Sequence, residues 1–403
     1  MKRQRIATVY IVLFFASLPV FSQPSLSLYD LSTLRQVQQA YQEKDPAFRD
    51  IVKKLERDAD KVLDLDPPSV TEKELTAPSG NTHDYTSMSR YWWPNPDTKD
   101  GLPYIRRDGE TNPEVKKYED HEKLERMAKG VTTLSLAYYF SGKEKYAEKA
   151  VEFIRVWFID TTTMMNPNMK YAQFVKGRNE GKGGGILDAR EFSMMLDMLG
   201  ILKTSASWTA ADHASLQSWF EQYLDWLRTS KNGTDEMNAK NNHGTWYDVQ
   251  TISIALFLGK TDLAKQIASE AKVKRIDNGF LPSGEQPEEL ARTRSLHYSL
   301  FNLEALMRLA RFGTAAGVNL WQYKGAQGAG IRRGVDYLLP FVAGEQEWSH
   351  EQIDPVSDQL KFLILAQAYT VYGDDRYLRA ASALSGLDRR KERNIALYGI
   401  RLP

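Results

Sequence analysis

The chain has 403 residues, of which 42% are hydrophobic and 26% are charged, so it can bury a large core and is not a disordered protein. Its 53 Lys and Arg residues nearly balance its 52 Asp and Glu residues, which argues against a polybasic protein that binds nucleic acid or membrane surfaces. Cysteine is absent, which excludes disulfides, thiolate nucleophiles and Cys-based metal sites.

The first 22 residues are typical of an export signal. Three basic residues precede an apolar run over residues 6–21, and Ser22 offers a small residue for cleavage. A membrane anchor is the alternative, but the run is short for a span and polar sequence follows it at once. We therefore expect a periplasmic or secreted protein that has no membrane association after the signal is cleaved. Without the signal, the formal charge of the chain is −2.

Helical hairpins dominate the rest of the chain. Apolar residues recur at spacings of three and four in paired segments, several of them separated by Gly turns. These pairs are 124–139 with 145–158, 192–202 with 218–227, 251–258 with 263–271, 296–312 with 331–342, and 359–372 with 376–384. The units lack a tight period, which favours a closed ring over a solenoid of identical repeats. We predict an all-α fold, an (α/α) toroid or incomplete barrel of about six to seven helical hairpins, as a single domain over residues 23–403.

Three irregular stretches interrupt the helices, over residues 67–113, 164–185 and 232–246. Loops of this length are usually functional, and in a ring of hairpins the connections at one end gather around the central cavity. The alternative is that they are flexible linkers. Each stretch contains large aromatic residues, which disordered linkers avoid, so we expect a site where these stretches meet.

The first stretch contains a Pro-bounded run of aromatic residues next to Arg90. Tyr91, Trp92 and Trp93 are consecutive and cannot all point inward, so at least one is expected to face a ligand. Aromatic faces stack on sugar rings and an Arg can hold a carboxylate, which suits an acidic carbohydrate. The alternative is a loop packed as a plug against the rim of the toroid.

The third stretch holds the run Asn-Asn-His-Gly-Thr-Trp-Tyr-Asp at 241–248, before a helix expected to begin near Val249. His243 can titrate near neutral pH, accept a proton or donate to an anion, whereas Asn242 can only donate or accept hydrogen bonds. The alternative is that the Asn residues cap the helix and His243 lies on the surface.

A further cluster runs from a Gly/Pro loop at 284–287 into a helix. Arg294 and Tyr298 are four residues apart and share a helical face. A nearby Arg favours the phenolate form of a Tyr, which helps it to exchange protons. Arg292 reaches the same pocket only if the helix begins near it. Alternatively, Glu288 pairs with Arg292 and Tyr298 belongs to the core.

Together these clusters resemble the alginate lyase superfamily of polysaccharide lyases. The run at 241–247 is the most telling piece, and the chain is most similar to polysaccharide lyase family 38 and more distantly to family 5. The resemblance covers nearly all of the chain after the signal. Its pieces are the Arg90 to Pro96 loop, Tyr171-Ala172-Gln173, the Gly-Ile-Leu-Asp-Ala-Arg run at 185–190, Asn242-His243, and the segment from Arg292 to Tyr298.

This resemblance implies uronic-acid polymers as substrates and a metal-free elimination. It assigns Asn242, Arg292 and protonated His243 to the neutralisation of the substrate carboxylate, and Tyr298 to proton transfer as base and acid. His243 is the alternative base for the opposite C5 epimer. Family 5 places its Arg one residue further from the Tyr, so the choice between Arg292 and Arg294 stays open.

Several further residues are predicted to bind the polymer. They are Arg90, Trp92, Trp93, Gln173, Arg178, Trp246 and Arg294, with Lys176, Lys182 and Arg190 as further candidates to line the cleft. Exposed Lys and Arg residues are more often merely solvated.

These observations predict a polysaccharide lyase that acts on 1,4-linked uronans, with alginate favoured and glucuronan as the close alternative. A glycoside hydrolase on the same toroid is the runner-up, with Asp188, Glu285 and Glu288 as candidate carboxylates, and a non-catalytic polysaccharide-binding protein is third. No cofactor is predicted, nor any metal, since the six His residues show no paired ligand spacing. The oligomeric state stays open.

Overall fold

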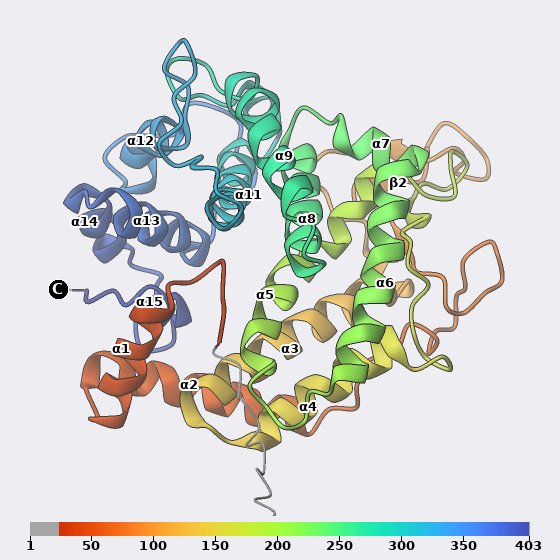
Figure 1. Cartoon of the computed structure of the whole chain (residues 1–403). Helices are drawn as coiled ribbons and strands as arrows, with labels where there is room; N and C mark the ends of the chain where they lie inside the picture. The colour runs from red at the N-terminus through yellow and green to blue at the C-terminus, as the bar shows by residue number, and fades with distance from the viewer. Residues whose placement is uncertain (1–23, 403) are drawn as a thin grey trace, which may run out of the picture.

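The computed structural model describes residues 24–402 (Figure 1). The predicted export signal therefore lies outside the described residues. Within them, fifteen α-helices are accompanied by two sheets of two short strands each. No helix of this part of the chain is long and apolar enough to cross a membrane.

The five predicted hairpins are all present. They are α3 (Asp120–Ser141) with α4 (Glu144–Ile154), α5 (Phe192–Leu202) with α6 (Ala210–Thr229), α8 (Asn242–Phe257) with α9 (Thr261–Ala271), α11 (Ser295–Ala315) with α12 (Ile331–Val342), and α13 (Asp358–Tyr372) with α14 (Asp375–Ala383). A sixth hairpin precedes them, formed by α1 (Leu31–Gln42) and α2 (Pro46–Leu63). Its helices begin at the capping side chains of Asp30 and Asp45.

The helices form a ring, as Figure 1 shows. Along it, α2, α3, α5, α8, α11 and α13 each contact the next. The short helix α15 (Arg393–Leu397) contacts both α13 and α2, which joins the last hairpin to the first. The inner helices α5 and α8 are buried on almost every side, whereas α2 and α14 bury one face only. This division is what a toroid requires, because its inner helices have no solvent-facing side.

Aromatic side chains fill much of the space between inner and outer helices. Phe158, Phe192, Trp219 and Phe220 pack edge to face, with ring centroids 4.7 Å apart for Phe158 and Trp219. Such pairs add to the free energy of burial. Much of the aromatic content of the chain therefore belongs to the core.

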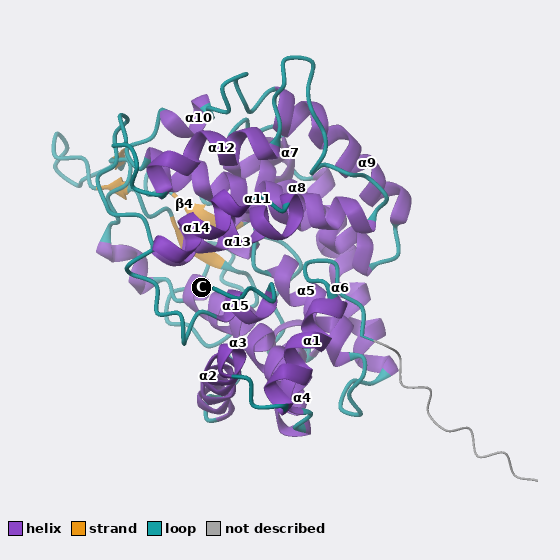
Figure 2. Ribbon diagram, turned by 90° about the vertical axis from the view of Figure 1, so that its left-hand side faces the viewer, coloured by secondary structure: helices purple, strands orange, loops and turns teal. Residues whose placement is uncertain are grey.

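The first two irregular stretches supply the small sheets. Strand β1 (Thr86–Met88) pairs in parallel with β4 (Tyr171–Phe174), and β2 (Trp92–Trp93) pairs antiparallel with β3 (Ile105–Arg106). Figure 2 shows these strands gathered at one side of the helical ring. The 3-10 helices η1 (Pro113–Lys117) and η3 (Gly183–Ala189) flank them. The predicted loops are thus ordered by pairing with each other.

The third stretch, predicted to be irregular, is largely helical. It contains α7 (Lys231–Met237), and α8 begins at Asn242 rather than near Val249. The side chain of Asn241 accepts a hydrogen bond from the backbone N–H of His243 (3.2 Å), which caps α8 early. Two π-helical turns, η2 (Arg155–Ile159) and η4 (Lys272–Asp277), extend α4 and α9, and α10 (Pro287–Leu290) is a single turn.

Candidate active site

A cavity of about 610 Å³ lies where the small sheets, η3 and the first turns of α8 and α11 meet. It unites residues from all three irregular stretches and from the start of α11. Seven of the eleven predicted site residues line it: Arg90, Trp92, Gln173, His243, Arg292, Arg294 and Tyr298. The structure therefore brings the three loops together at one site, as predicted.

Tyr298 and Tyr91 form a pair of phenols in this cavity. Tyr298 lies in the first turn of α11, and its hydroxyl is 2.9 Å from that of Tyr91. Burial and the contact with Tyr91 raise the pKa of Tyr298 above its usual value, although the charge of Arg292 lowers it. The expected shift toward the phenolate is therefore wrong, because burial outweighs the Arg. Tyr298 is a protonated phenol at neutral pH.

Arg292 lies in the break between α10 and α11. Its guanidinium carbon is 3.9 Å from the centroid of the Tyr298 ring, and it donates to both carboxylate oxygens of Asp108 (2.7 and 2.9 Å). Burial would raise the pKa of Asp108, but the hydrogen bonds and charge of Arg292 hold it well below its usual range. Arg292 is thus fixed by Asp108, and the alternative pairing with Glu288 is wrong.

His243 is held by a buried carboxylate. Its Nδ1 is 2.7 Å from Oε1 of Glu236, a residue of α7 that is 3% exposed. Burial lowers the pKa of His243, but the charge and hydrogen bond of Glu236 raise it above its usual value overall. With Nδ1 occupied, Nε2 is the ring nitrogen left for a ligand. The pair therefore offers a charged donor to an anion.

Asn242 is fully buried and does not line the cavity, although its neighbours Asn241 and His243 do. Its backbone N–H and its side-chain Nδ2 both donate to Glu289 (2.5 and 2.9 Å). Burial raises the pKa of Glu289. This arrangement fixes the first turn of α8, and with it the position of His243.

Gln173 is held in an unusual backbone conformation at the edge of the cavity. Its φ angle is +49°, in the left-handed region that side chains disfavour, at an irregularity in the pairing of β1 with β4. Its backbone N–H donates to Ser87 (2.8 Å) and its Nε2 donates to Asp188 (2.7 Å). These contacts compensate the strain and hold the side chain at the cavity.

Arg90, Trp92 and Arg294 complete the predicted lining. Arg90 donates to Nε2 of His121 (3.1 Å), and Arg294 lies 3.4 Å from a carboxylate oxygen of Asp354. The ring of Trp92 lies under two cations, including Lys182 at 6.0 Å.

Three other predicted binding residues lie outside the lining. Successive side chains of a strand point to opposite faces, so Trp93 turns away from Trp92 and donates to the carbonyl of Glu110 (3.0 Å). Arg178 is exposed, and its guanidinium carbon lies 5.0 Å from the ring centroid of Trp92. Trp246 is fully buried against Phe301, with ring centroids 5.1 Å apart.

Sequence reasoning missed four residues of the site: Tyr91, Asp108, Glu236 and His297. Burial, and then the charges of Arg294 and Arg292, lower the pKa of His297 to about 4, so it is a neutral side chain of the cavity wall. Tyr91 was present in the aromatic run, and Glu236 lies seven residues before His243. Asp108 lies 184 positions from its partner, and no local pattern connects them.

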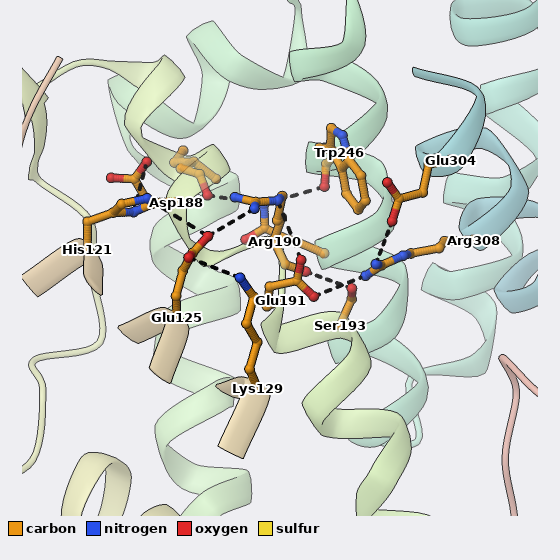
Figure 3. Close-up of polar contacts among 12 residues, drawn as sticks. His121, Glu125, Lys129, Asp188, Arg190, Glu191, Ser193, Trp246, Glu304 and Arg308 are labelled. Carbon is orange, nitrogen blue, oxygen red and sulfur yellow. Dashed lines mark hydrogen bonds and ion pairs between the residues drawn. The ribbon is translucent and has the colours of Figure 1, made fainter. Parts of the chain in front are cut away.

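None of the carboxylates that line the cavity is free to act as a general acid. Glu125 pairs with Arg190 (3.1 Å), as Figure 3 shows, and Glu236 is bound to His243. Asp188 accepts hydrogen bonds from Tyr85, Ser87 and Gln173 at 2.6 to 2.9 Å. Burial raises its pKa, but the nearby His121 and these donors lower it overall. Glu285 and Glu288 are not part of the lining.

The cavity carries excess positive charge. Its lining has six Lys and Arg residues against three carboxylates, namely Arg90, Arg106, Lys182, Arg190, Arg292 and Arg294 against Glu125, Asp188 and Glu236. This charge suits a polyanionic ligand. Among residues 24–402, no group of three or more His, Asp or Glu side chains could hold a metal ion.

A family model described as alginate lyase matches residues 69–348. Among solved structures, an alginate lyase from Bacteroides ovatus is 38% identical over 94% of this chain and 100% of that chain, with a TM-score of 0.89. Alginate lyase A1-III, in a histidine-to-alanine variant complexed with a tetrasaccharide, is 16% identical over 94% of this chain and 97% of that chain, with a TM-score of 0.60.

The structure of A1-III from Sphingomonas species A1 is 16% identical over 85% of this chain and 94% of that chain, with a TM-score of 0.54. At this identity the two A1-III structures bear on the fold alone, and they share its mostly helical α/α toroid. A comparison with curated proteins finds no match.

Proposed function

The chain belongs to the alginate lyase family and is a polysaccharide lyase, and we propose that it cleaves alginate by β-elimination in the cavity around Tyr298. The reaction leaves a 4,5-unsaturated uronate at the new chain end. The observation that carries the proposal is the Tyr91–Tyr298 hydrogen bond (2.9 Å) beside the Arg292 guanidinium, in a cavity of excess positive charge. Within the superfamily, the run at 241–247 supports the proposal that the chain is most similar to polysaccharide lyase family 38.

The first requirement of the reaction is to neutralise the uronate carboxylate, because the C5 proton is very weakly acidic while that group is fully charged. Arg292 and the His243 imidazolium are the donors that stabilise the enediolate-like charge. Both are fixed in advance, Arg292 by Asp108 and His243 by Glu236. Asn242 acts as a positioning residue, since it donates to Glu289 and lies behind the cavity wall.

The second requirement is a group that moves two protons. As a neutral phenol, Tyr298 has a lone pair for the C5 proton and a proton for the O4 atom of the leaving sugar. The C5–H and C4–O4 bonds break, the C4=C5 double bond forms, and Tyr298 ends in its starting protonation state. The raised pKa of Tyr298 therefore suits this step, and Tyr91 holds the hydroxyl in place through its hydrogen bond.

A single group acting on one face of the sugar performs a syn elimination. Glu236 binds Nδ1 of His243 and favours its protonated form, which makes His243 a poor base for the opposite face. In mannuronate and glucuronate the C5 hydrogen and O4 lie on the same face of the ring, whereas in guluronate and galacturonate they lie on opposite faces. The site thus favours the mannuronate blocks of alginate, with glucuronan as the second substrate.

A substrate panel tests this proposal. Polymannuronate, polyguluronate, glucuronan and pectate are incubated with the protein, and unsaturated ends are followed by ultraviolet absorbance. We expect polymannuronate and glucuronan to be cleaved faster than the other two. Saturated products would indicate a hydrolase, and a preference for polyguluronate would show that the base lies on the other face. Cleavage of neutral glycans alone would overturn the proposal entirely.

The site of action follows from the first 22 residues. We propose that they direct export and are then removed, so that a single toroid domain acts on its polymer in the periplasm or outside the cell. N-terminal sequencing of the protein from the periplasmic fraction tests this. A full-length N-terminus retained in the cytoplasm would contradict it.

A further inference from the structure

A row of ion pairs crosses the interior of the ring behind the active-site cavity. Figure 3 shows Glu125, Arg190, Glu191, Arg308 and Glu304 in this row. Glu125 and Arg190 line the active-site cavity. The other three line a second cavity of about 150 Å³, which we call the back cavity. The proposed reaction uses none of its residues.

We propose that the back cavity is a second saccharide-binding site, which takes a single uronate unit at the end of a chain. The identity of the ligand rests on the proposed function, because oligouronates are the products that the reaction releases around the protein. The existence of the site rests on the charges, rings and amides of the cavity itself.

The charges of the back cavity are not balanced. Four of the side chains that line it are cationic and two are carboxylates, namely Lys129, Arg308, Arg311 and Arg393 against Glu191 and Glu304. Both carboxylates bind Arg308, at 3.5 Å and 2.7 Å. Lys129 binds Glu125 of the active-site cavity (3.1 Å). The back cavity therefore keeps positive charge at Arg311 and Arg393.

Arg311 is held ready for an anion. Its guanidinium carbon lies 5.3 Å from the ring centroid of Tyr398 and 5.7 Å from that of Trp321, and its Nε donates to Gln367 (3.3 Å). No carboxylate of residues 24–402 forms an ion pair with it or with the exposed Arg393. A planar guanidinium with free N–H groups fits a carboxylate in a bidentate manner.

The other walls suit a sugar rather than an inorganic ion. The rings of Tyr29 and Tyr398 lie 5.6 Å apart at 52° and present apolar surface, while Gln367 and Asn394 offer amide groups for hydroxyls. A cavity of about 150 Å³ admits one six-membered ring.

A neighbouring groove gives room for the rest of the chain. It has a volume of about 610 Å³, shares Arg311 with the back cavity, and is lined by Asn319, Trp321 and Gln322. A terminal uronate can thus lie in the back cavity while the next sugar units extend toward Trp321.

Calorimetric titration of a saturated mannuronate disaccharide into full-length protein tests this site. The Tyr298→Phe background slows turnover and leaves the active-site cavity able to bind. We expect two sites per chain. Arg311→Gln on this background should leave one site, and Arg393→Gln should weaken the second site about tenfold, the effect of losing one charge-assisted contact. Arg379→Gln, an exposed Arg of α14 outside both cavities, should leave both sites unchanged.

The outcomes separate this proposal from the proposed function. One site in the Tyr298→Phe parent, or two unchanged sites in both Arg variants, would overturn the second site. Full competition by inorganic phosphate at equal concentration would show an anion site without sugar recognition, which also overturns it. Because Arg393 is exposed, its variant keeps the test valid even if Arg311→Gln lowers the melting temperature. Failure of the wild-type protein to cleave any uronan would defeat the proposed function instead.

Discussion

Two neighbours of Tyr298 act on its proton in opposite directions. The Arg292 guanidinium favours the phenolate, while burial and the Tyr91 hydroxyl favour the phenol, and the phenol prevails. The protonated form can give its own proton to O4 while it takes the C5 proton, so the phenol ends the step in its starting protonation state. The contact with Arg292 stabilises the negative charge that develops on the phenol oxygen as its proton moves to O4.

Replacement of the phenol by a ring without oxygen tests this role. Tyr298→Phe keeps the ring under Arg292, so the fold should persist while kcat on polymannuronate falls by about 10²- to 10⁴-fold, the usual contribution of a general acid or base. Tyr91→Phe removes only the orienting hydrogen bond and should lower kcat by a smaller factor. Ultraviolet absorbance measures both rates. A folded Tyr298→Phe protein with near wild-type rates on every uronan would place the chemistry elsewhere.

The Glu236–His243 pair sets a pH dependence. Burial lowers the pKa of His243, but Glu236 raises it above its usual value overall, so the imidazolium persists to a higher pH than that of a free His and is lost as the pH rises through that pKa. Glu236→Gln lowers the pKa, so the alkaline limb of the profile of kcat/KM should move down by about one pH unit or more. Glu110→Gln, at an exposed carboxylate outside the cavity, is the matched control. An unchanged alkaline limb would mean that His243 carries no needed charge.

For single residues of the site, the sequence predicts the residue type better than the direction in which the side chain points. Asn242 and His243 are adjacent, yet one is buried against Glu289 and the other lines the cavity. Trp92 and Trp93 are separated in the same way by strand alternation. The composition of these segments indicated which residue types to expect, but which side chain faces the cavity depends on where α8 begins and on a strand of two residues.

At the scale of elements, apolar periodicity identified the five long hairpins because a helix buried in a ring must repeat its apolar residues every turn. The same signal missed α7 and the start of α8, since both are short, polar segments held by the caps at Ser230 and Asn241. The break at residues 291–294 between α10 and α11 is the element that brings Arg292 to Tyr298. A continuous helix would have turned Arg292 away.

The segment before α1 crosses α5 and is fixed there by Asp197. The backbone N–H groups of Ser27 and Leu28 donate to its carboxylate (2.7 and 3.0 Å). At Gly200 a Cβ atom would lie 1.6 Å from the carbonyl oxygen of Ser25, so only glycine permits this approach. The contact explains how the segment before α1 places Leu28 and Tyr29 in the wall of the back cavity.

Asp197 makes this docking sensitive to pH. Burial raises its pKa to about 6 despite the two backbone donors. The folded state therefore holds the proton more tightly than the unfolded state, and stability falls as the pH rises from about 4 through 6. Asp197→Asn does not titrate, so its stability relative to wild type should be about 2–3 kcal/mol higher at pH 8 than at pH 4. Urea unfolding at the two pH values measures it, and an equal difference at both would contradict a buried, titrating carboxylate.

At the scale of the molecule, the ring closes through α15, and its interior is divided by the ion-pair row into two cavities of unequal size. The toroid and the gathering of its loops at one cavity follow from the sequence pattern, because long aromatic loops gather at the end of a ring of hairpins. The division does not, since Arg190, Arg308 and their carboxylates come from α3, from α11 and from the turn between η3 and α5. Only packing brings such charges together, and each is costly to bury unless paired.

The charge of the active-site cavity bears on the need for a metal. A lyase can neutralise the uronate carboxylate with a divalent cation or with side chains, and here six Lys and Arg residues line the cavity. We predict full activity on polymannuronate after exhaustive chelation and dialysis at constant ionic strength, which must be held because salt screens a cationic cavity from its substrate. A calcium-dependent lyase treated in parallel verifies that chelation is complete. Activity that is lost and then restored by added calcium would assign the neutralising role to a bound ion instead of Arg292 and His243. In that case Arg292→Ala should reduce the rate far less than about a thousandfold, the range expected for a principal charge-stabilising group.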